Sequence, residues 1–130
     1  MIVVDTSAMI AIFLDEPEGS EFVAIIRAAE RPVISAAGIV ETLIVLDNRT
    51  GDDNRDLMRD MLNELALMVE PVALADAWLA AEAYRRFGRG RHPAKLNYGG
   101  CFAYALARRL DLPLLFKGDD FRHTDIRSAC

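Results

Sequence analysis

Short apolar runs alternate with longer helical segments along this chain, and this alternation restricts its fold more than any other feature. Runs with strand character are expected at residues 2–4, 32–34, 69–72 and 113–116. Between them lie segments with helical periodicity, at 8–14, 20–29, 36–49, 52–68, 75–87 and 97–110. Strands that alternate with helices in this way form a parallel sheet with helices on both faces. We therefore predict a three-layer α/β/α domain with a central, mainly parallel sheet.

The chain has the size and apolar content of one compact domain. Its 130 residues are 52% hydrophobic, and we expect residues 1–130 to form a single domain with a real core. The apolar start runs directly into Asp5, without the basic leader and cleavage site of a secretion signal. No apolar run approaches the roughly 18 residues that span a membrane. Cys101 and Cys130 form no metal-binding or disulfide pattern. These observations predict a cytoplasmic protein without a membrane partner.

The charge of the chain is unevenly distributed. The formal net charge of −5 alone argues against a general affinity for nucleic acids. However, there is no acidic residue between Glu82 and Asp111. The basic residues of this stretch are Arg85, Arg86, Arg89, Arg91, Lys95, Arg108 and Arg109. Because phosphate contacts depend on local cationic patches, this stretch indicates a phosphate-bearing partner, and a solvated basic loop is the alternative.

Acidic residues follow the ends of two predicted strands. Asp5 follows the first apolar run, and Asp119 and Asp120 follow the last one. In an open α/β sheet, ligands bind beyond the carboxyl ends of the strands, so these acids are expected to share a crevice. An ordinary polar turn is the alternative for the pair after the last strand. Of that pair, Asp119 is nearer the strand end and is the first choice for the site.

Glu41 interrupts the apolar run of a predicted helix. Its neighbours three and four positions away are Ala37, Gly38, Ile44 and Val45, none of which is charged. A carboxylate in these surroundings is expected to be partly buried, and it then requires a cation or an arginine as a partner. A solvated helix face is the alternative interpretation.

Carboxylates gathered in one pocket predict a divalent metal ion. They would repel one another and raise each other's pKa unless cations are bound. Oxygen-only ligands fit Mg²⁺ or Mn²⁺, ions that activate water and stabilise the leaving oxygen when a phosphodiester is hydrolysed. Ser7 either orients Asp5 or caps the helix that follows, and Lys117 either binds phosphate or is simply exposed. The candidate metal ligands are Asp5, Glu41, Asp119 and Asp120.

These motifs, in this order, resemble the PIN-domain ribonucleases, specifically the VapC-type toxins of bacterial toxin–antitoxin pairs. The motifs are Asp5-Thr6-Ser7-Ala8, Glu41 in its apolar helix, Leu96-Asn97-Tyr98-Gly99, Cys101-Phe102, the run from Leu114 to Phe121, and His123-Thr124-Asp125. The resemblance covers nearly the whole chain. It implies a PIN-like fold and a magnesium-dependent endoribonuclease that is the toxin of a type II system, forms a homodimer and is inhibited by a cognate VapB-like antitoxin.

The resemblance also assigns expected roles to single residues. The expected catalytic residues are Asp5, Glu41, Asp119 and Ser7. The residues expected to contact the RNA backbone are Arg85, Arg86, Arg89, Arg91, Lys95 and Lys117. Tyr98 and Phe102 could stack a base, although residues at this spacing are more often part of the core. An exposed apolar groove for the antitoxin is expected on helix 20–29 or helix 52–68.

Gly100 departs from the pattern of this family. It stands where the pattern has an aspartate that is a principal metal ligand. Glycine early in a helix costs up to about 1 kcal/mol relative to alanine, whereas the helix dipole favours an acid there. We hypothesise that Gly100 weakens or abolishes the activity.

Two further classes of function compete with the ribonuclease. A module that binds the antitoxin and RNA without cutting would also be consistent with Gly100. A phosphate-transfer α/β domain, such as a haloacid-dehalogenase-like phosphatase or a receiver domain, would likewise carry an acid after its first strand. The phosphatase requires a second aspartate where Ser7 stands, and the receiver requires paired acids and a strand-end lysine, which only Lys117 partly supplies.

Overall fold

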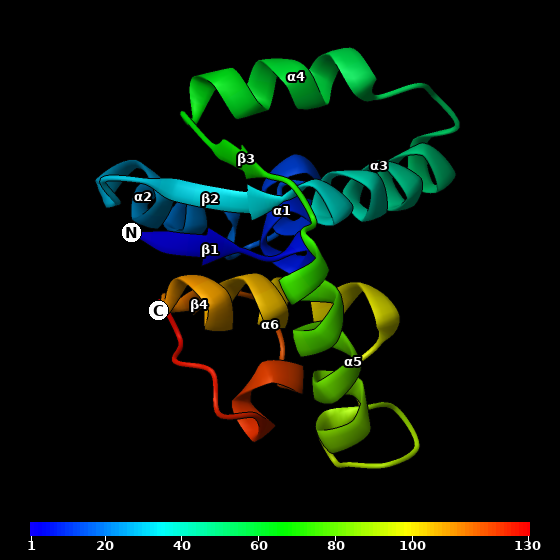
Figure 1. Ribbon diagram of the computed structural model, residues 1–130. Helices are drawn as coiled ribbons and strands as arrows, with labels where there is room; N and C mark the ends of the chain where they lie inside the picture. Colours follow the sequence, from blue (N-terminus) through cyan, green and yellow to red (C-terminus); the bar gives the residue numbers. More distant parts are fainter.

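The computed structural model describes all residues, 1–130, and is built around one four-stranded sheet (Figure 1). The strands are β1 (Ile2–Val4), β2 (Pro32–Ser35), β3 (Met68–Glu70) and β4 (Leu114–Leu115), in the spatial order β3-β2-β1-β4. All three neighbouring pairs are parallel, with Val3 opposite Val33 on one side and Leu114 on the other. The predicted parallel sheet is confirmed.

Helices connect the strands as the alternation predicts. They are α1 (Thr6–Phe13), α2 (Gly19–Ala28), α3 (Ala36–Thr50), α4 (Arg55–Glu64), α5 (Leu74–Phe87) and α6 (Tyr98–Leu110), and a 3₁₀ turn, η1, covers Asp120–His123. Polar side chains cap several of them. Ser35 caps α3 by accepting a hydrogen bond from the N–H of Ala37, and Asn97 caps α6 by accepting one from the N–H of Gly100.

The sheet separates two apolar cores because neighbouring strand residues point to opposite faces. Ile2, Val4 and Ile34 belong to the core that includes residues of α1, α2 and α4. Val3 and Val33 belong to the core that includes residues of α5 and α6. Figure 1 shows these two groups of helices on opposite sides of the sheet. The three-layer α/β/α arrangement is therefore confirmed. None of the helices combines the length and the apolar character that a membrane span requires.

The main difference from the predicted elements lies at the end of α4. The predicted helix extends to residue 68, but α4 ends at Glu64. Leu65 and Leu67 are both buried, and Ala66 between them has a φ of 52°. This left-handed turn places both leucines in the core and leads the chain into β3, which begins at Met68.

Candidate active site

An acidic cavity of about 220 Å³ lies beyond the carboxyl ends of β1 and β4. It is lined by Asp5, Thr6, Ser7, Glu41, Val45, Leu96, Asn97, Gly100, Lys117, Asp120 and Phe121. The structure thus brings together three of the four acids that the sequence nominated. They come from the end of β1, the middle of α3 and the turn after β4.

Asp5 is held by a short chain of hydrogen bonds. Its Oδ2 accepts from the backbone N–H of Ser7 at 3.0 Å and from the Ser7 hydroxyl at 2.6 Å. The Ser7 Oγ in turn accepts from the backbone N–H of Lys117 at 2.9 Å, which ties the turn after β1 to the end of β4. Ser7 therefore orients Asp5, as one of the two interpretations of the sequence expects. The other interpretation, that Ser7 caps the helix, is wrong, because the N-cap of α1 is Asp5, which accepts the hydrogen bond from the Ser7 N–H.

Burial makes the Asp5 carboxylate unfavourable when it is ionised. The residue is only 6% exposed. Burial raises the pKa of Asp5 to about 6, with a smaller upward contribution from Glu41, while the hydrogen bonds from Ser7 act in the opposite direction. A cation in the cavity would relieve both the desolvation and the repulsion between the two acids.

Glu41 is half-buried, as its apolar neighbours predict, and its carboxylate lies against the backbone of α6. A Cβ atom at Gly99 would overlap both the carboxylate carbon and its oxygens. Because Gly99 has no side chain, the Glu41 carboxylate can occupy this space. Among the ion pairs of the molecule none involves Glu41, so the partner that its burial calls for is not an arginine or a lysine of this chain.

Asp120, and not Asp119, lines the cavity, which corrects the preference drawn from the sequence. The side chain of Asp119 is 82% exposed and pairs with Arg122 at 3.6 Å. The physical reason is the turn after β4. Gly118 has a φ of 96°, and the buried Phe121 ring packs 5.2 Å from that of Phe116. This packing anchors η1, whose first residue is Asp120, at the edge of the cavity.

Gly100 contributes backbone but no ligand to the cavity wall. Its N–H donates to Asn97 Oδ1 at 2.7 Å in the first turn of α6. A Cβ at this position would lie 3.1 Å from Asn97 Oδ1 and 2.8 Å from Leu96 Cδ1. A side chain at position 100 therefore requires the Leu96 methyl group to shift.

The side chains of the cavity are of the kind that binds a divalent cation, but they are too far apart to surround one as they stand. Its donors are carboxylate oxygens, which Mg²⁺ and Mn²⁺ prefer. However, no three Asp, Glu, His or Cys side chains of the chain are grouped closely enough to hold a metal ion. The expectation of four converging carboxylates is therefore wrong on two counts. Asp119 points to solvent, and the remaining acids line the cavity without closing on a common point.

Lys117 matches neither of the two alternatives drawn from the sequence, a free phosphate ligand or a simply exposed residue. It lines the cavity, but its Nζ lies 3.0 Å from both Glu16 Oε1 and Glu18 Oε2. These two acids raise the pKa of Lys117. The charge of Lys117 is therefore largely neutralised by the two glutamates between α1 and α2. This makes Lys117 a weaker candidate for an RNA contact than the sequence suggests.

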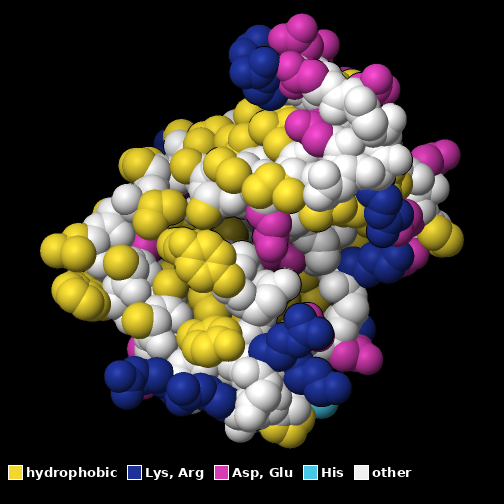
Figure 2. Space-filling model, turned by 90° about the vertical axis from the view of Figure 1, so that its right-hand side faces the viewer, with side chains coloured by type: hydrophobic (Ala, Val, Ile, Leu, Met, Phe, Trp, Pro, Cys, Tyr) yellow, Lys and Arg dark blue, Asp and Glu magenta, His cyan; other side chains and the backbone are white.

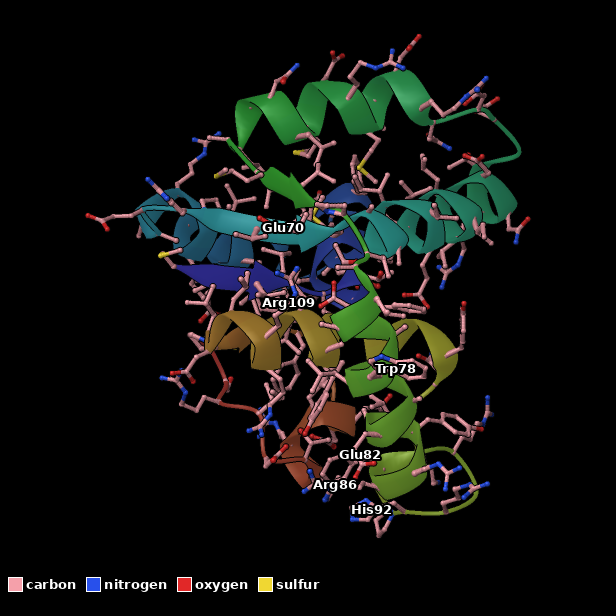
Figure 3. All side chains as sticks on the ribbon, viewed as in Figure 1. Glu70, Trp78, Glu82, Arg86, His92 and Arg109 are labelled. Carbon is pink, nitrogen blue, oxygen red and sulfur yellow. The ribbon has the colours of Figure 1, made fainter.

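The basic stretch divides into structural and free charges. Arg109 pairs with Asp76 and Glu70, and Arg108 pairs with Asp125. Figure 3 shows Arg109 lying between α6 and Glu70 on β3. The five basic residues at the end of α5 and in the following loop are all exposed. Of these five, only Arg86 forms an ion pair, with Asp125. Within this stretch, the exposed basic residues without an ion pair are Arg85, Arg89, Arg91 and Lys95.

Sequence reasoning missed an apolar groove that adjoins the acidic cavity. The groove has a volume of about 640 Å³ and runs between α3 and the start of α6. It is lined by Ala37, Val40, Glu41, Ile44, Val45, Val72, Asn97, Tyr98, Gly99 and Phe102. Figure 2 shows this face, where apolar side chains gather beside acidic ones, with Lys and Arg side chains below. The i, i+4 pair Val40 and Ile44, which is exposed, was the signal in the sequence. The expectation of a groove on helix 20–29 or helix 52–68 is wrong, because no residue of α2 or α4 lines any of the three main cavities.

Known proteins resemble this chain over nearly its whole length. The family model of the PIN domain matches residues 2–127. Ribonuclease VapC30 of Mycobacterium tuberculosis (strain ATCC 25618 / H37Rv) is 42% identical over 128 residues, which cover 98% of this chain and 98% of that protein. Ribonuclease VapC of Mycolicibacterium smegmatis is also 42% identical over 128 residues, with coverages of 98% and 99%.

Two solved structures share the fold. The crystal structure of Mycobacterium tuberculosis VapC20, described as a sarcin–ricin loop cleaving toxin, superposes with a TM-score of 0.75 at 17% identity, covering 98% of this chain and 99% of that one. A toxin–antitoxin complex from Klebsiella pneumoniae superposes with a TM-score of 0.69 at 17% identity, covering 96% and 93%.

Proposed function

This chain belongs to the PIN-domain family, among the VapC-type ribonucleases, and on that premise we propose that it is the toxin of a type II toxin–antitoxin pair that cleaves RNA phosphodiesters with Mg²⁺ or Mn²⁺. The observation that carries the proposal is the shared cavity of Asp5, Glu41 and Asp120 at the carboxyl ends of β1 and β4. These three residues would have to move closer together to hold the ion, since no three acids of the chain are grouped closely enough as they stand. Activation of water and stabilisation of the leaving oxygen are the chemistry that a divalent ion supplies to such a site.

In this proposal the chain's own residues prepare the site. Ser7 holds Asp5 in one orientation through its hydroxyl, and Gly99 leaves room for Glu41. Gly100 leaves the site one carboxylate short, which makes the ion weakly bound and the activity low. The alternative function is a module that binds the antitoxin and RNA without catalysis. Gly100 favours it, and so does the fact that no three possible metal ligands lie close together.

The RNA backbone would cross the basic end of α5. Arg85, Arg89, Arg91 and Lys95 are exposed and form no ion pair, so their charges are free for phosphate. Arg86 is also exposed but shares its charge with Asp125. In Figure 3, Arg86 lies near the end of α5 that is distant from Glu70 and the sheet. RNA would thus approach the acidic cavity from this side and be held mainly by its phosphates.

The antitoxin would occupy the apolar groove between α3 and α6. One solved structure that shares the fold is a toxin–antitoxin complex. Val40 and Ile44 offer exposed apolar side chains, and Glu41 stands where the groove meets the acidic cavity. A VapB-like peptide with apolar residues followed by Arg or Lys would fill the groove and neutralise the acids.

A second copy of the chain would cover another apolar surface. Leu74 and Trp78 on the outside of α5, together with Met68 on the edge strand β3, are among the most exposed large apolar residues. Figure 3 shows Trp78 projecting from α5. Their burial in a homodimer would remove this area from water. An enzyme that acts on cellular RNA would work in the cytoplasm.

The proposed function can be tested by RNA cleavage with the purified chain. We expect slow cleavage with Mg²⁺ or Mn²⁺ that a chelator abolishes and that Asp5→Asn removes. Asp119→Asn is the matched control, because Asp119 points to solvent, and it should cleave like the parent chain. Cleavage that survives the chelator or Asp5→Asn would contradict the proposal. Retained RNA binding without any cleavage, even after position 100 is restored to aspartate, would establish the binding module instead.

A further inference from the structure

A second hollow adjoins the acidic cavity and is lined differently from the apolar groove. It has a volume of about 420 Å³ and is lined by only four residues, Tyr84, Arg89, Asn97 and Tyr98. Asn97 also lines the acidic cavity, so the two spaces meet at this residue. A group bound in the hollow would therefore lie next to the proposed site of cleavage.

Tyr98 is unusually exposed for an aromatic residue. It is 78% accessible to solvent, although it opens a helix whose following residues are largely buried. Its ring is held edge to face by Phe102, with the centroids 4.9 Å apart and the planes at 81°. Phe102 thus supports the ring without covering most of it. Tyr84 contributes a second, partly exposed aromatic ring to the same hollow.

Arg89 supplies a free positive charge to this hollow. It is exposed and forms no ion pair, whereas Arg86, three residues earlier, pairs with Asp125. The backbone of Arg89 is fixed, because its N–H donates to the carbonyl oxygen of Leu96 at 3.0 Å. A guanidinium group beside aromatic rings can contact a phosphate or stack on a base.

We propose that Tyr84, Arg89 and Tyr98 form a subsite for one unpaired nucleotide of the RNA, adjacent to the phosphodiester that is cleaved. The inference rests on the proposed ribonuclease function and extends it to the residues that hold one nucleotide beside the cleaved bond. The base stacks on Tyr98, Arg89 contacts the neighbouring phosphate, and a base held in this way must be free of a double helix. The substrate is therefore single-stranded at this position, as in a loop, a bulge or an end.

The hollow fits a nucleotide better than a protein side chain. No aliphatic residue lines it, whereas the lining of the apolar groove includes Val40, Ile44, Val45 and Val72. Aromatic rings combined with an unpaired arginine are the features that hold single-stranded nucleic acids. Tyr98 lines both spaces, so the test must separate stacking of a base from apolar contact with a protein.

The test is RNA binding by the full chain with a chelator present, so that no cleavage occurs. A fluorescent single-stranded RNA and a duplex of the same length are titrated with the parent chain, Tyr98→Ala, Tyr98→Phe, Tyr98→Leu and Arg89→Ala. Stacking is worth roughly tenfold to a hundredfold in affinity per base. We expect such a loss of single-strand affinity in Tyr98→Ala and Tyr98→Leu, and retained affinity in Tyr98→Phe.

Two further arms identify the base and the phosphate. An RNA with one abasic position should bind the parent chain more weakly but bind Tyr98→Ala as the intact RNA does. Arg89→Ala should make RNA affinity less dependent on salt concentration, by the amount that corresponds to the loss of about one phosphate contact. Arg31→Ala is the matched control, since Arg31 is exposed, forms no ion pair and precedes β2 at the opposite end of the sheet; it should change neither affinity nor salt dependence.

Affinity in Tyr98→Leu equal to that of the parent chain would overturn the subsite, and so would equal losses for single-stranded and duplex RNA. Weaker capture of an apolar basic peptide by Tyr98→Ala, with RNA affinity unchanged, would assign Tyr98 to a protein interface instead. These outcomes leave the ribonuclease proposal intact, because that proposal depends on Asp5 and the metal ion. Conversely, if the chain shows no metal-dependent cleavage, the RNA-binding result for Tyr98 and Arg89 still stands, because binding is measured with a chelator present.

Discussion

Gly100→Asp should raise the rate of metal-dependent RNA cleavage by about a hundredfold or more, because it adds the missing carboxylate to a cavity that already contains three. Position 100 lies in the first turn of α6, where the helix dipole favours a negative charge. The existing hydrogen bond from the Gly100 N–H to Asn97 involves only backbone of residue 100 and can persist in the variant.

The new side chain also has a steric requirement, which must be separated from its charge. Its Cβ would lie 2.8 Å from Leu96 Cδ1, so the end of this buried side chain has to move. Gly100→Asn makes the same steric demand without supplying a carboxylate, and it should leave cleavage at the level of the parent chain. An equal gain from Gly100→Asn, or no gain from Gly100→Asp in a folded protein, would refute the assignment of position 100 as the missing ligand.

Asp5→Asn should stabilise the metal-free protein at pH 8 by about 2–3 kcal/mol, even though it abolishes the proposed activity. Burial raises the pKa of Asp5 to about 6 in the folded chain from an ordinary value of 3.8. The folded state therefore binds the proton more tightly than the unfolded state. Below about pH 4 both states are protonated and the group has no effect. As the pH rises from about 4 to 6, the folded state alone retains the proton and loses stability relative to the unfolded state.

The measurement is urea unfolding of the parent chain and Asp5→Asn in the presence of a chelator, from pH 4 to pH 8. The difference in free energy of unfolding should grow between pH 4 and about 6 and then remain constant. Asp119→Asn, at an exposed acid, should show no such dependence. Added Mg²⁺ should reduce the difference at pH 8, because it stabilises only the chain with the Asp5 carboxylate. A difference independent of pH would contradict the conclusion that burial raises the pKa of Asp5.

Local patterns in the sequence were sufficient for the fold and for two acids of the site. The apolar runs of β1 and β4 and the periodicity of the helices determine which faces are buried, and the parallel sheet follows from their alternation. Asp5 was identifiable because it ends a strand. Glu41 was identifiable because it interrupts an apolar helix, and it is half-buried as expected.

The remaining features depend on contacts between distant residues. The choice between Asp119 and Asp120 is made by the turn at Gly118 and the packing of Phe121 against Phe116. Lys117 is neutralised by Glu16 and Glu18, about a hundred positions earlier in the chain. The end of α4 is set by a left-handed residue between two buried leucines, which helical propensity alone cannot indicate.

In the proposed function, Asp5, Glu41 and Asp120 form a divalent metal site that lacks one ligand at position 100. Mn²⁺ titration by calorimetry tests this proposal most directly. We predict weak binding by the parent chain, at least about tenfold tighter binding by Gly100→Asp, and no binding by Asp5→Asn at the same concentrations. Equal Mn²⁺ affinity in all three proteins would show that the ion is held elsewhere, and would contradict the account.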